Sequence, residues 1–199
     1  MDTWSSLYKI GFSQDDNAQY AKPGNWNDPD MLIIGYVGWS SNLHPTRLTP
    51  DEQYTHISLW SLLSAPLLIG CDMEKFDDFT LNLLSNDEVL AVNQDILGNQ
   101  AVSILRENGI EIWAKDLEDG SKAVGVFYTG DSENPVKMFS WDGGKSNKKV
   151  VVNWSDLGIS GSQNVRDLWR QKDLGDFIEG FETEVAHHGV TLLKISDNQ

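Results

Sequence analysis

The sequence predicts two structural classes in one chain, an α/β segment over residues 1–98 and an antiparallel all-β segment over residues 99–199. In the first segment, two short apolar runs at residues 31–34 and 67–70 alternate with helical patterns, which is typical of strands that pair in parallel. In the second segment, short apolar runs recur between turn sequences, as in a β-sandwich or barrel. The change in pattern falls near residues 98–100.

The first helix is predicted over residues 2–12. Asp2 or Thr3 can cap it, the apolar side chains that follow have i, i+3, i+4 spacing, and Gly11 is a stop signal. Residues 13–25 are polar and predict a loop. The first apolar strand run follows this loop.

The second helix, predicted over residues 50–64, has the clearest start signal in the chain. Thr49 is an N-cap residue, Pro50 takes the first helical position, and Glu52 completes a capping box. The connection before it, residues 35–48, is expected to be irregular, and such long connections often carry function. Two further short helices are predicted at residues 79–84 and 87–93.

Hairpin signals dominate the second segment. Asn108-Gly109 and Asp119-Gly120 each separate two apolar runs, which is the strongest short-range signal for a β-hairpin. The predicted strands are residues 102–105, 110–114, 123–128, 136–141, 149–154, 163–169, 177–185 and 190–195.

The charge balance excludes several classes of partner. The chain has 30 acidic and 15 basic residues and a formal net charge of −15, so it would repel nucleic acid and anionic membrane surfaces. A neutral ligand fits this charge, and eight Trp residues favour a carbohydrate because indole rings stack on the apolar faces of sugars. The single cysteine excludes an intrachain disulfide. The first residues carry no signal-peptide pattern, and the compartment stays open, with a secreted or periplasmic whole protein as one option.

A polar cluster precedes the first apolar strand run. Trp26 offers a flat ring, and Asp28 and Asp30 flank Pro29, which stiffens the backbone. This arrangement is compatible with sugar binding. The alternative is that one carboxylate caps a turn and Trp26 fills core.

No pattern in the sequence predicts a cofactor or a metal. The histidines lack metal-ligand spacing, and the triplet Asp15-Asp16-Asn17 lacks the alternating pattern of a calcium loop. Acid–base chemistry by Asp28 and Asp30 together is disfavoured, because both would approach a substrate from one side, whereas glycosidic cleavage needs groups on either side of the bond.

Several long motifs resemble the α-galactosidases (melibiases) of glycoside hydrolase family 27. The matching stretches are residues 26–32, 56–70, 84–98 and 165–190. The resemblance implies the terminal segments of a (β/α)8 TIM barrel followed by an antiparallel β-sandwich. It places the start of the chain near the sixth barrel helix, with residues 30–35 as strand seven and residues 67–70 as strand eight.

The resemblance also implies a retaining hydrolase of terminal α-galactosides with two catalytic carboxylates. The sequence motifs that surround these two carboxylates in the family do not occur in this chain. Asp2 matches only the start of the helix that follows the acid/base residue. We therefore expect no catalytic residue in this chain. Asp30 and Met31 match residues that line the sugar pocket. Trp26 is a further candidate for the pocket wall, and Asp28 is expected to brace the loop.

Three alternatives to an α-galactosidase remain at this point, namely two other sugar specificities and a binding module. Close relatives cleave α-N-acetylgalactosaminides or β-L-arabinopyranosides, and this chain does not select among them. A non-catalytic carbohydrate-binding or interaction module built on residues 100–199 would use its tryptophans, Trp113, Trp141, Trp154 and Trp169. The expected partners are a galactoside and either an upstream barrel half or a second copy of the chain.

Overall fold

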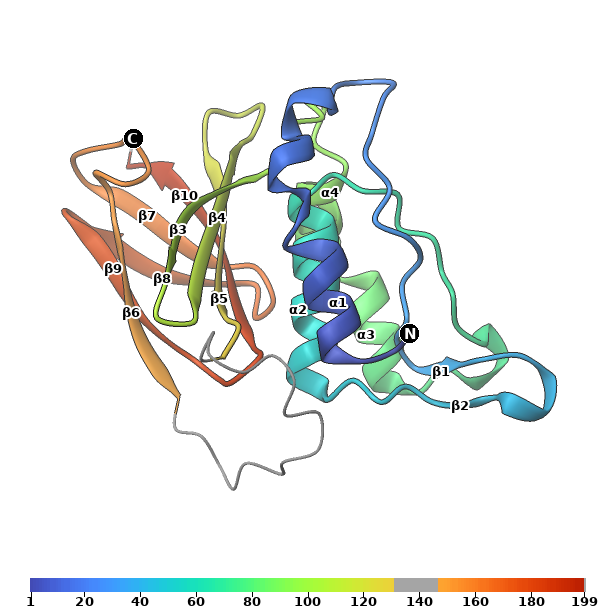
Figure 1. Cartoon of the computed structure of the whole chain (residues 1–199). Coiled ribbons are helices and arrows are strands. Elements are labelled where there is room, and N and C mark those ends of the chain that lie inside the picture. Colours follow the sequence, from blue (N-terminus) through green and yellow to red (C-terminus); the bar gives the residue numbers. More distant parts are fainter. Residues whose placement is uncertain (131–146, 199) are drawn as a thin grey trace.

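The computed structural model describes residues 1–130 and 147–198, and the strand predicted at residues 136–141 lies outside this part. The described chain forms three layers: helices, a large antiparallel sheet, and a small two-stranded sheet (Figure 1). The helices come from the first half of the chain and both sheets of the sandwich from the second half.

The four α-helices occur close to where the sequence predicts them. They are α1 (Trp4–Gly11), α2 (Pro50–Leu62), α3 (Asp78–Ser85) and α4 (Asp87–Asn93). Helix α2 has the predicted capping box, in which the Thr49 hydroxyl accepts the Glu52 N–H and the Glu52 carboxylate accepts the Thr49 N–H. Thr3, and not Asp2, caps α1 by accepting the Ser6 N–H at 3.4 Å.

The two predicted parallel strands are shorter than expected. Residues 31–34 and 67–70 meet in a single parallel bridge between Leu32 and Ile69, with hydrogen bonds from Leu32 N–H to Leu68 O at 2.8 Å and from Gly70 N–H to Leu32 O at 3.1 Å. The direction of pairing is as predicted. The prediction of full strands over residues 30–35 and 67–70 is wrong, because no neighbouring strand in the described part of the chain extends the ladder on either side.

Two loops predicted as irregular contain regular structure. The predicted loop at residues 13–25 holds the 3₁₀ helix η1 (Gln14–Tyr20), and the connection at residues 35–48 holds a hairpin of β1 (Tyr36–Val37) and β2 (His44–Pro45) with the 3₁₀ turn η2 (Ser40–Asn42) at its tip. A third 3₁₀ turn, η3 (Met73–Lys75), precedes α3. These short elements lack apolar periodicity, so nothing in the sequence pattern marks them.

The sandwich is antiparallel throughout its described strands, as predicted. The large sheet has the order β3-β4-β5-β10-β7-β8, and β6 pairs with β9 in the small sheet. One predicted strand is wrong, because residues 177–185 contain a turn and divide into the end of β8 and the whole of β9. The strands are β3 (Val102–Glu107), β4 (Ile110–Asp116), β5 (Lys122–Tyr128), β6 (Lys148–Asn153), β7 (Gln163–Asp167), β8 (Lys172–Phe177), β9 (Gly180–Val185) and β10 (Val190–Asp197).

Alternating side chains of the large sheet enter two different cores. Phe127 and Leu192 face the helices and pack with Leu62 of α2, whereas Val124 and Leu193 face the small sheet. Gly125 permits the close approach of α2, because a Cβ there would lie 2.5 Å from the Leu62 side chain. The helices and the sheet therefore share one core, and the division into domains at residues 98–99 stays a prediction.

None of the described helices is long and apolar enough to span a bilayer.

Candidate functional site

Asp28 and Asp30 shape a tight corner of the backbone. The Asp28 carboxylate accepts the Asp30 N–H at 2.9 Å, and the Asp30 carboxylate accepts the Met31 N–H at 2.7 Å. Asp30 has a φ of 78°, a left-handed conformation that Asp tolerates better than most residues. The hydrogen bond that Asp28 accepts from the Asp30 N–H is the kind of contact by which a side chain braces a loop. Asp30 stays exposed, so the second oxygen of its carboxylate is open to a ligand.

Helix α2 supports this corner and the residues after it. Trp60 donates its indole N–H to the Asp30 carbonyl at 2.8 Å, His56 Nε2 accepts the Ile33 N–H at 3.1 Å, and Gln53 accepts the Gly35 N–H at 3.2 Å. The three side chains have i, i+3, i+7 spacing and are all buried. The sequence analysis did not predict this role. The signal that could have indicated it is the presence of polar residues on a helix face that is otherwise apolar.

The protonation of His56 follows from its position. Burial lowers the pKa of His56 to about 3, so the ring is neutral at physiological pH. Because Nε2 accepts a hydrogen bond, the ring proton lies on Nδ1. His56 also packs edge-on against Trp60, with ring centroids 4.2 Å apart. It is a fixed acceptor that holds the backbone and has no acid–base role at this pH.

Met31 lies on the apolar edge formed by residues 68–70. A Cβ at Gly70 would lie 2.5 Å from the Met31 sulfur, so only glycine permits this contact. Met31 is 41% exposed, and the neighbouring Leu68 and Ile69 are 51% and 46% exposed. The Asp30 corner therefore combines an open carboxylate with an apolar surface, which are the two features that a sugar ring needs.

Trp26 lies half-exposed on the approach to the corner. Its neighbour Asn27 is anchored by side-chain hydrogen bonds to Asn17 O and to Gln100, both at 2.7 Å. Within the described residues, Trp26 itself makes no hydrogen bond or ring contact with Asp28 or Asp30. The structure thus brings Asp28, Asp30 and Met31 together and leaves Trp26 beside them.

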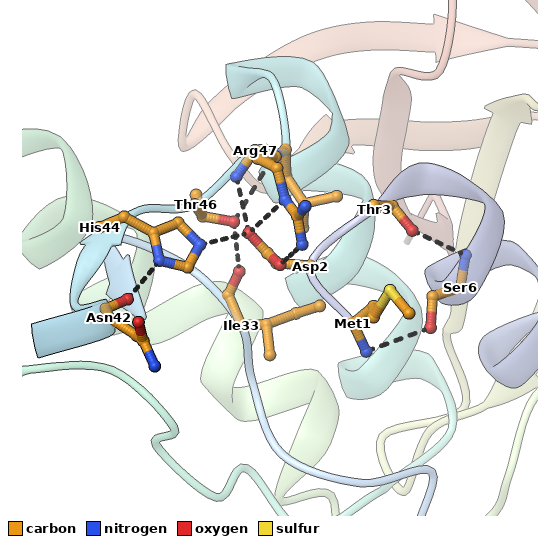
Figure 2. Close-up of polar contacts among 10 residues, drawn as sticks. Met1, Asp2, Thr3, Ser6, Ile33, Asn42, His44, Thr46 and Arg47 are labelled. Atoms are coloured by element: carbon orange, nitrogen blue, oxygen red, sulfur yellow. Dashed lines mark hydrogen bonds and ion pairs between the residues drawn. The ribbon is translucent and has the colours of Figure 1, made fainter. Parts of the chain in front are cut away.

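Asp2 forms a second polar cluster that the sequence did not predict (Figure 2). Its carboxylate accepts hydrogen bonds from the Arg47 backbone N–H and from Arg47 Nε, both at 3.1 Å, and it also contacts Arg47 Nη2. His44 Nε2 lies 3.3 Å from the same carboxylate. Burial alone would raise the pKa of Asp2, but the hydrogen bonds and charge of Arg47 outweigh it and hold the pKa well below its usual range. The cluster ties the start of α1 to the β1–β2 hairpin.

The sandwich tryptophans that the structure describes do not form a binding surface. Trp113 and Trp154 are buried in the cores, and Trp169 donates its indole N–H to Ser58 of α2 at 2.8 Å. Trp141 lies outside the described residues. The three described tryptophans therefore give no support to the non-catalytic binding module.

A hollow of about 420 Å³ opens elsewhere, between the small sheet and the edge of the large sheet. Two of its charged lining residues pair with each other, since Arg170 donates to the Asp167 carboxylate at 2.6 Å. The described residues include no group of three or more His, Cys, Asp or Glu side chains that could hold a metal ion.

Comparison with known families agrees with the sequence motifs in both halves. A family model described as "Alpha galactosidase A" matches residues 1–95, and one described as "Alpha galactosidase C-terminal beta sandwich domain" matches residues 107–195. An α-galactosidase of Cyamopsis tetragonoloba is 41% identical over 170 residues, which cover 84% of this chain and 36% of the relative. A probable α-galactosidase of Dictyostelium discoideum is 33% identical and covers 98% of this chain and 46% of the relative.

Solved structures of the same family superpose on nearly the whole chain. A glycoside hydrolase family 27 β-L-arabinopyranosidase of Geobacillus stearothermophilus in complex with arabinose has 30% identity and a TM-score of 0.86, covering 100% of this chain and 43% of that one. The α-galactosidase I of Mortierella vinacea has 28% identity and a TM-score of 0.81, covering 96% and 45%. The chain thus spans less than half the length of these relatives. With both family models in order and the enzyme fold superposed, the chain belongs to the α-galactosidase family, glycoside hydrolase family 27, as its carboxyl-terminal portion.

Proposed function

We propose that this chain is the carboxyl-terminal part of a retaining glycoside hydrolase that releases terminal α-linked galactose. The observation that carries the proposal is the ordered match of residues 1–95 and 107–195 to the two α-galactosidase family models. The Asp30 corner supports it, because it offers a carboxylate acceptor for sugar hydroxyls next to the apolar surface of Met31.

The division of labour within the enzyme is part of this proposal. The chain supplies one wall of the sugar pocket, with Asp30 and Met31 in contact with galactose and Asp28 holding their backbone. An upstream barrel half supplies the nucleophile and the acid/base. It would pair with the exposed edge at residues 68–69, whose apolar side chains are open to solvent. The 199-residue chain alone is then expected to be inactive.

The test is to fuse the upstream barrel half of the Cyamopsis relative before Met1 and to assay an aryl α-galactoside. The fused protein should turn over this substrate, while the 199-residue chain should not. A fused protein that folds, as judged by circular dichroism and cooperative melting, but shows no turnover would overturn the proposal.

The sugar substituent is tested with the same fused protein. Solved relatives include a β-L-arabinopyranosidase and a putative α-N-acetylgalactosaminidase. We expect kcat/KM to be highest for the aryl α-galactoside among the three matching aryl glycosides. A higher value for either of the other two would reassign the substrate class and leave the glycosidase assignment in place.

A further inference from the structure

Trp39 is the most exposed tryptophan of the described chain, at 84% exposure. It lies at the tip of the β1–β2 hairpin, which projects away from the helices and the sheets (Figure 1). A single exposed apolar side chain needs no explanation by itself. The anchored hairpin that carries Trp39 does need an explanation.

The tip of the hairpin has a specified conformation. Gly38 has a φ of 102°, and a Cβ there would lie 2.4 Å from the Asn42 carbonyl oxygen, so only glycine fits. Ser40 has a left-handed φ of 49°, and the Asn42 N–H bonds the Trp39 carbonyl at 2.9 Å. The backbone on both sides of Trp39 is therefore held in place.

The base of the hairpin is tied to the start of α1. Figure 2 shows Asp2 between His44 and Arg47, both of which belong to the β2 side of the hairpin. Thr46 adds two bonds to the apolar segment, from its N–H to Gly35 O at 2.7 Å and from its hydroxyl to Ile33 O at 2.8 Å.

A second tie joins the hairpin to the loop after residues 67–70. The Asp72 N–H bonds the Tyr36 carbonyl at 2.8 Å, and the Lys75 ammonium lies 5.1 Å from the centre of the Tyr36 ring. Trp39 is thus displayed on an anchored backbone, so the hairpin does not have to be ordered when the indole binds a ligand.

The position of the hairpin indicates what the ligand is. The hairpin connects residues 31–34 to α2, and its neighbour at residues 72–75 follows the parallel partner segment, so both are loops that leave the carboxyl side of parallel segments. In barrel enzymes these loops surround the substrate. The formal net charge of −15 favours a neutral ligand there.

We propose that Trp39 is the stacking platform for the sugar on the leaving-group side of the scissile bond, an inference that rests on the proposed glycosidase function. The galactose ring would occupy the Asp30 corner, next to the core. Trp39 stands at the far end of the same connection, where it meets the part of an oligosaccharide that extends outward. Ser40 and Ser41 follow Trp39 directly and are exposed, so their hydroxyl groups can bond the hydroxyls of that sugar.

The test compares substrates with and without a sugar leaving group in the fused enzyme described above. Trp39→Ala should lower kcat/KM for melibiose about tenfold, mainly through KM, because a tenfold loss corresponds to about 1.4 kcal/mol, which lies within the range of aromatic stacking. The rate with α-galactosyl fluoride, whose leaving group has no ring, should not change. Trp39→Phe should retain most of the melibiose activity. Tyr20→Ala removes another exposed aromatic side chain and should change neither rate.

Each other outcome has a defined meaning. An unchanged rate with melibiose, or equal losses on both substrates, overturns the role of Trp39. Equal losses accompanied by a lower Tm would show that Trp39 packs against the upstream barrel half instead. An unmutated fused enzyme that cleaves neither substrate contradicts the proposed function itself, and the two failures are thereby separated.

Discussion

At the scale of single residues, two carboxylates of this chain fix backbone N–H groups. Asp28 holds the Asp30 N–H, and Asp2 holds the backbone and side chain of Arg47. The sequence indicated Asp28 and Asp30 because a proline lies between them. It did not indicate the role of Asp2, because Arg47 is 45 residues away along the chain. Local spacing predicts local contacts only.

Asp2→Asn should destabilise the fold by about 1–3 kcal/mol at pH 7, because the amide cannot replace the charged acceptor of Arg47. The native pKa of Asp2 is depressed, so its contribution is present above its unfolded pKa and is lost as the pH falls below about 4. Urea unfolding at several pH values measures this. Asp16→Asn, at an exposed position, is the control. Equal stability of the two variants at pH 7 would contradict the role of Asp2.

Asp30→Asn should weaken galactose binding in the fused enzyme and leave the fold intact. The Asn side-chain oxygen can still accept the Met31 N–H, but it loses the charge that strengthens bonds to sugar hydroxyls. We expect KM to rise about tenfold or more, since hydrogen bonds to charged groups contribute roughly 1.5–3 kcal/mol. Asp28→Ala is the matched comparison and should lower stability. A loss confined to the acid/base limb of the pH–rate profile would contradict this assignment of Asp30.

At the scale of elements, helix α2 does two things that its pattern shows only in part. The capping box at Thr49 is local and was predicted correctly. The use of Gln53 and His56 to hold residues 33–35 was not predicted, because their partners lie on a segment 18–23 residues earlier in the chain. The strand predicted at residues 31–34 is observed as a single bridge for the same reason, because the length of a strand depends on the strands that pair with it.

Lys115 of β4 links two helix ends to the sheet. Its ammonium donates to the Val92 carbonyl of α4 at 2.6 Å, to Ser64 Oγ at 2.7 Å and to the Ser61 carbonyl of α2 at 3.4 Å. Burial lowers the pKa of Lys115 to about 8. The cation sits at the negative ends of two helix dipoles, which offsets part of the cost of burying it.

This arrangement predicts a rise in stability between pH 8 and 9.5. Above the native pKa of about 8, the folded protein releases the Lys115 proton while the unfolded chain still binds it, up to about pH 10.4, so unfolding becomes less favourable. The gain should be about 1–2 kcal/mol over this range. Lys115→Met keeps the apolar stem and should abolish the rise, whereas exposed Lys9→Met should retain it. Denaturant unfolding of both variants at pH 8 and pH 9.5 measures this change in the free energy of unfolding.

At the scale of the whole molecule, the helices and the sandwich pack against each other through a shared core. Leu62 of α2 and Phe127 of β5 share a core, and Tyr8 of α1 donates to the buried Glu111 of β4 at 3.0 Å. The helices leave one edge uncovered, at Met31, Leu68 and Ile69. The sandwich supports the barrel helices but does not cover this edge.

The uncovered edge should make the 199-residue chain self-associate. Exposed apolar side chains beside a short parallel pair offer both hydrophobic area and unpaired backbone groups. Light scattering should therefore report species larger than a monomer at micromolar concentration. Ile69→Lys should shift the population toward monomer, and Ile178→Lys, at an exposed apolar residue of the β8–β9 turn, should not. A monodisperse monomer for the unmutated chain would contradict this prediction.

The sequence by itself determined the features that depend on neighbours within a few residues. These are the capped helices, the Asn108-Gly109 hairpin, the alternation of the sandwich strands, and the long motifs that indicate the family. Only the tertiary structure decided what Asp2, His56 and Lys115 bind and that Trp39 is exposed. The first three bind partners far away along the chain, and the hairpin that carries Trp39 is anchored at its base by the Asp2 carboxylate. Local structure follows from the spacing and the propensities of nearby residues. The partner of a polar side chain, and the exposure of an apolar one, depend on which segments the packing brings together.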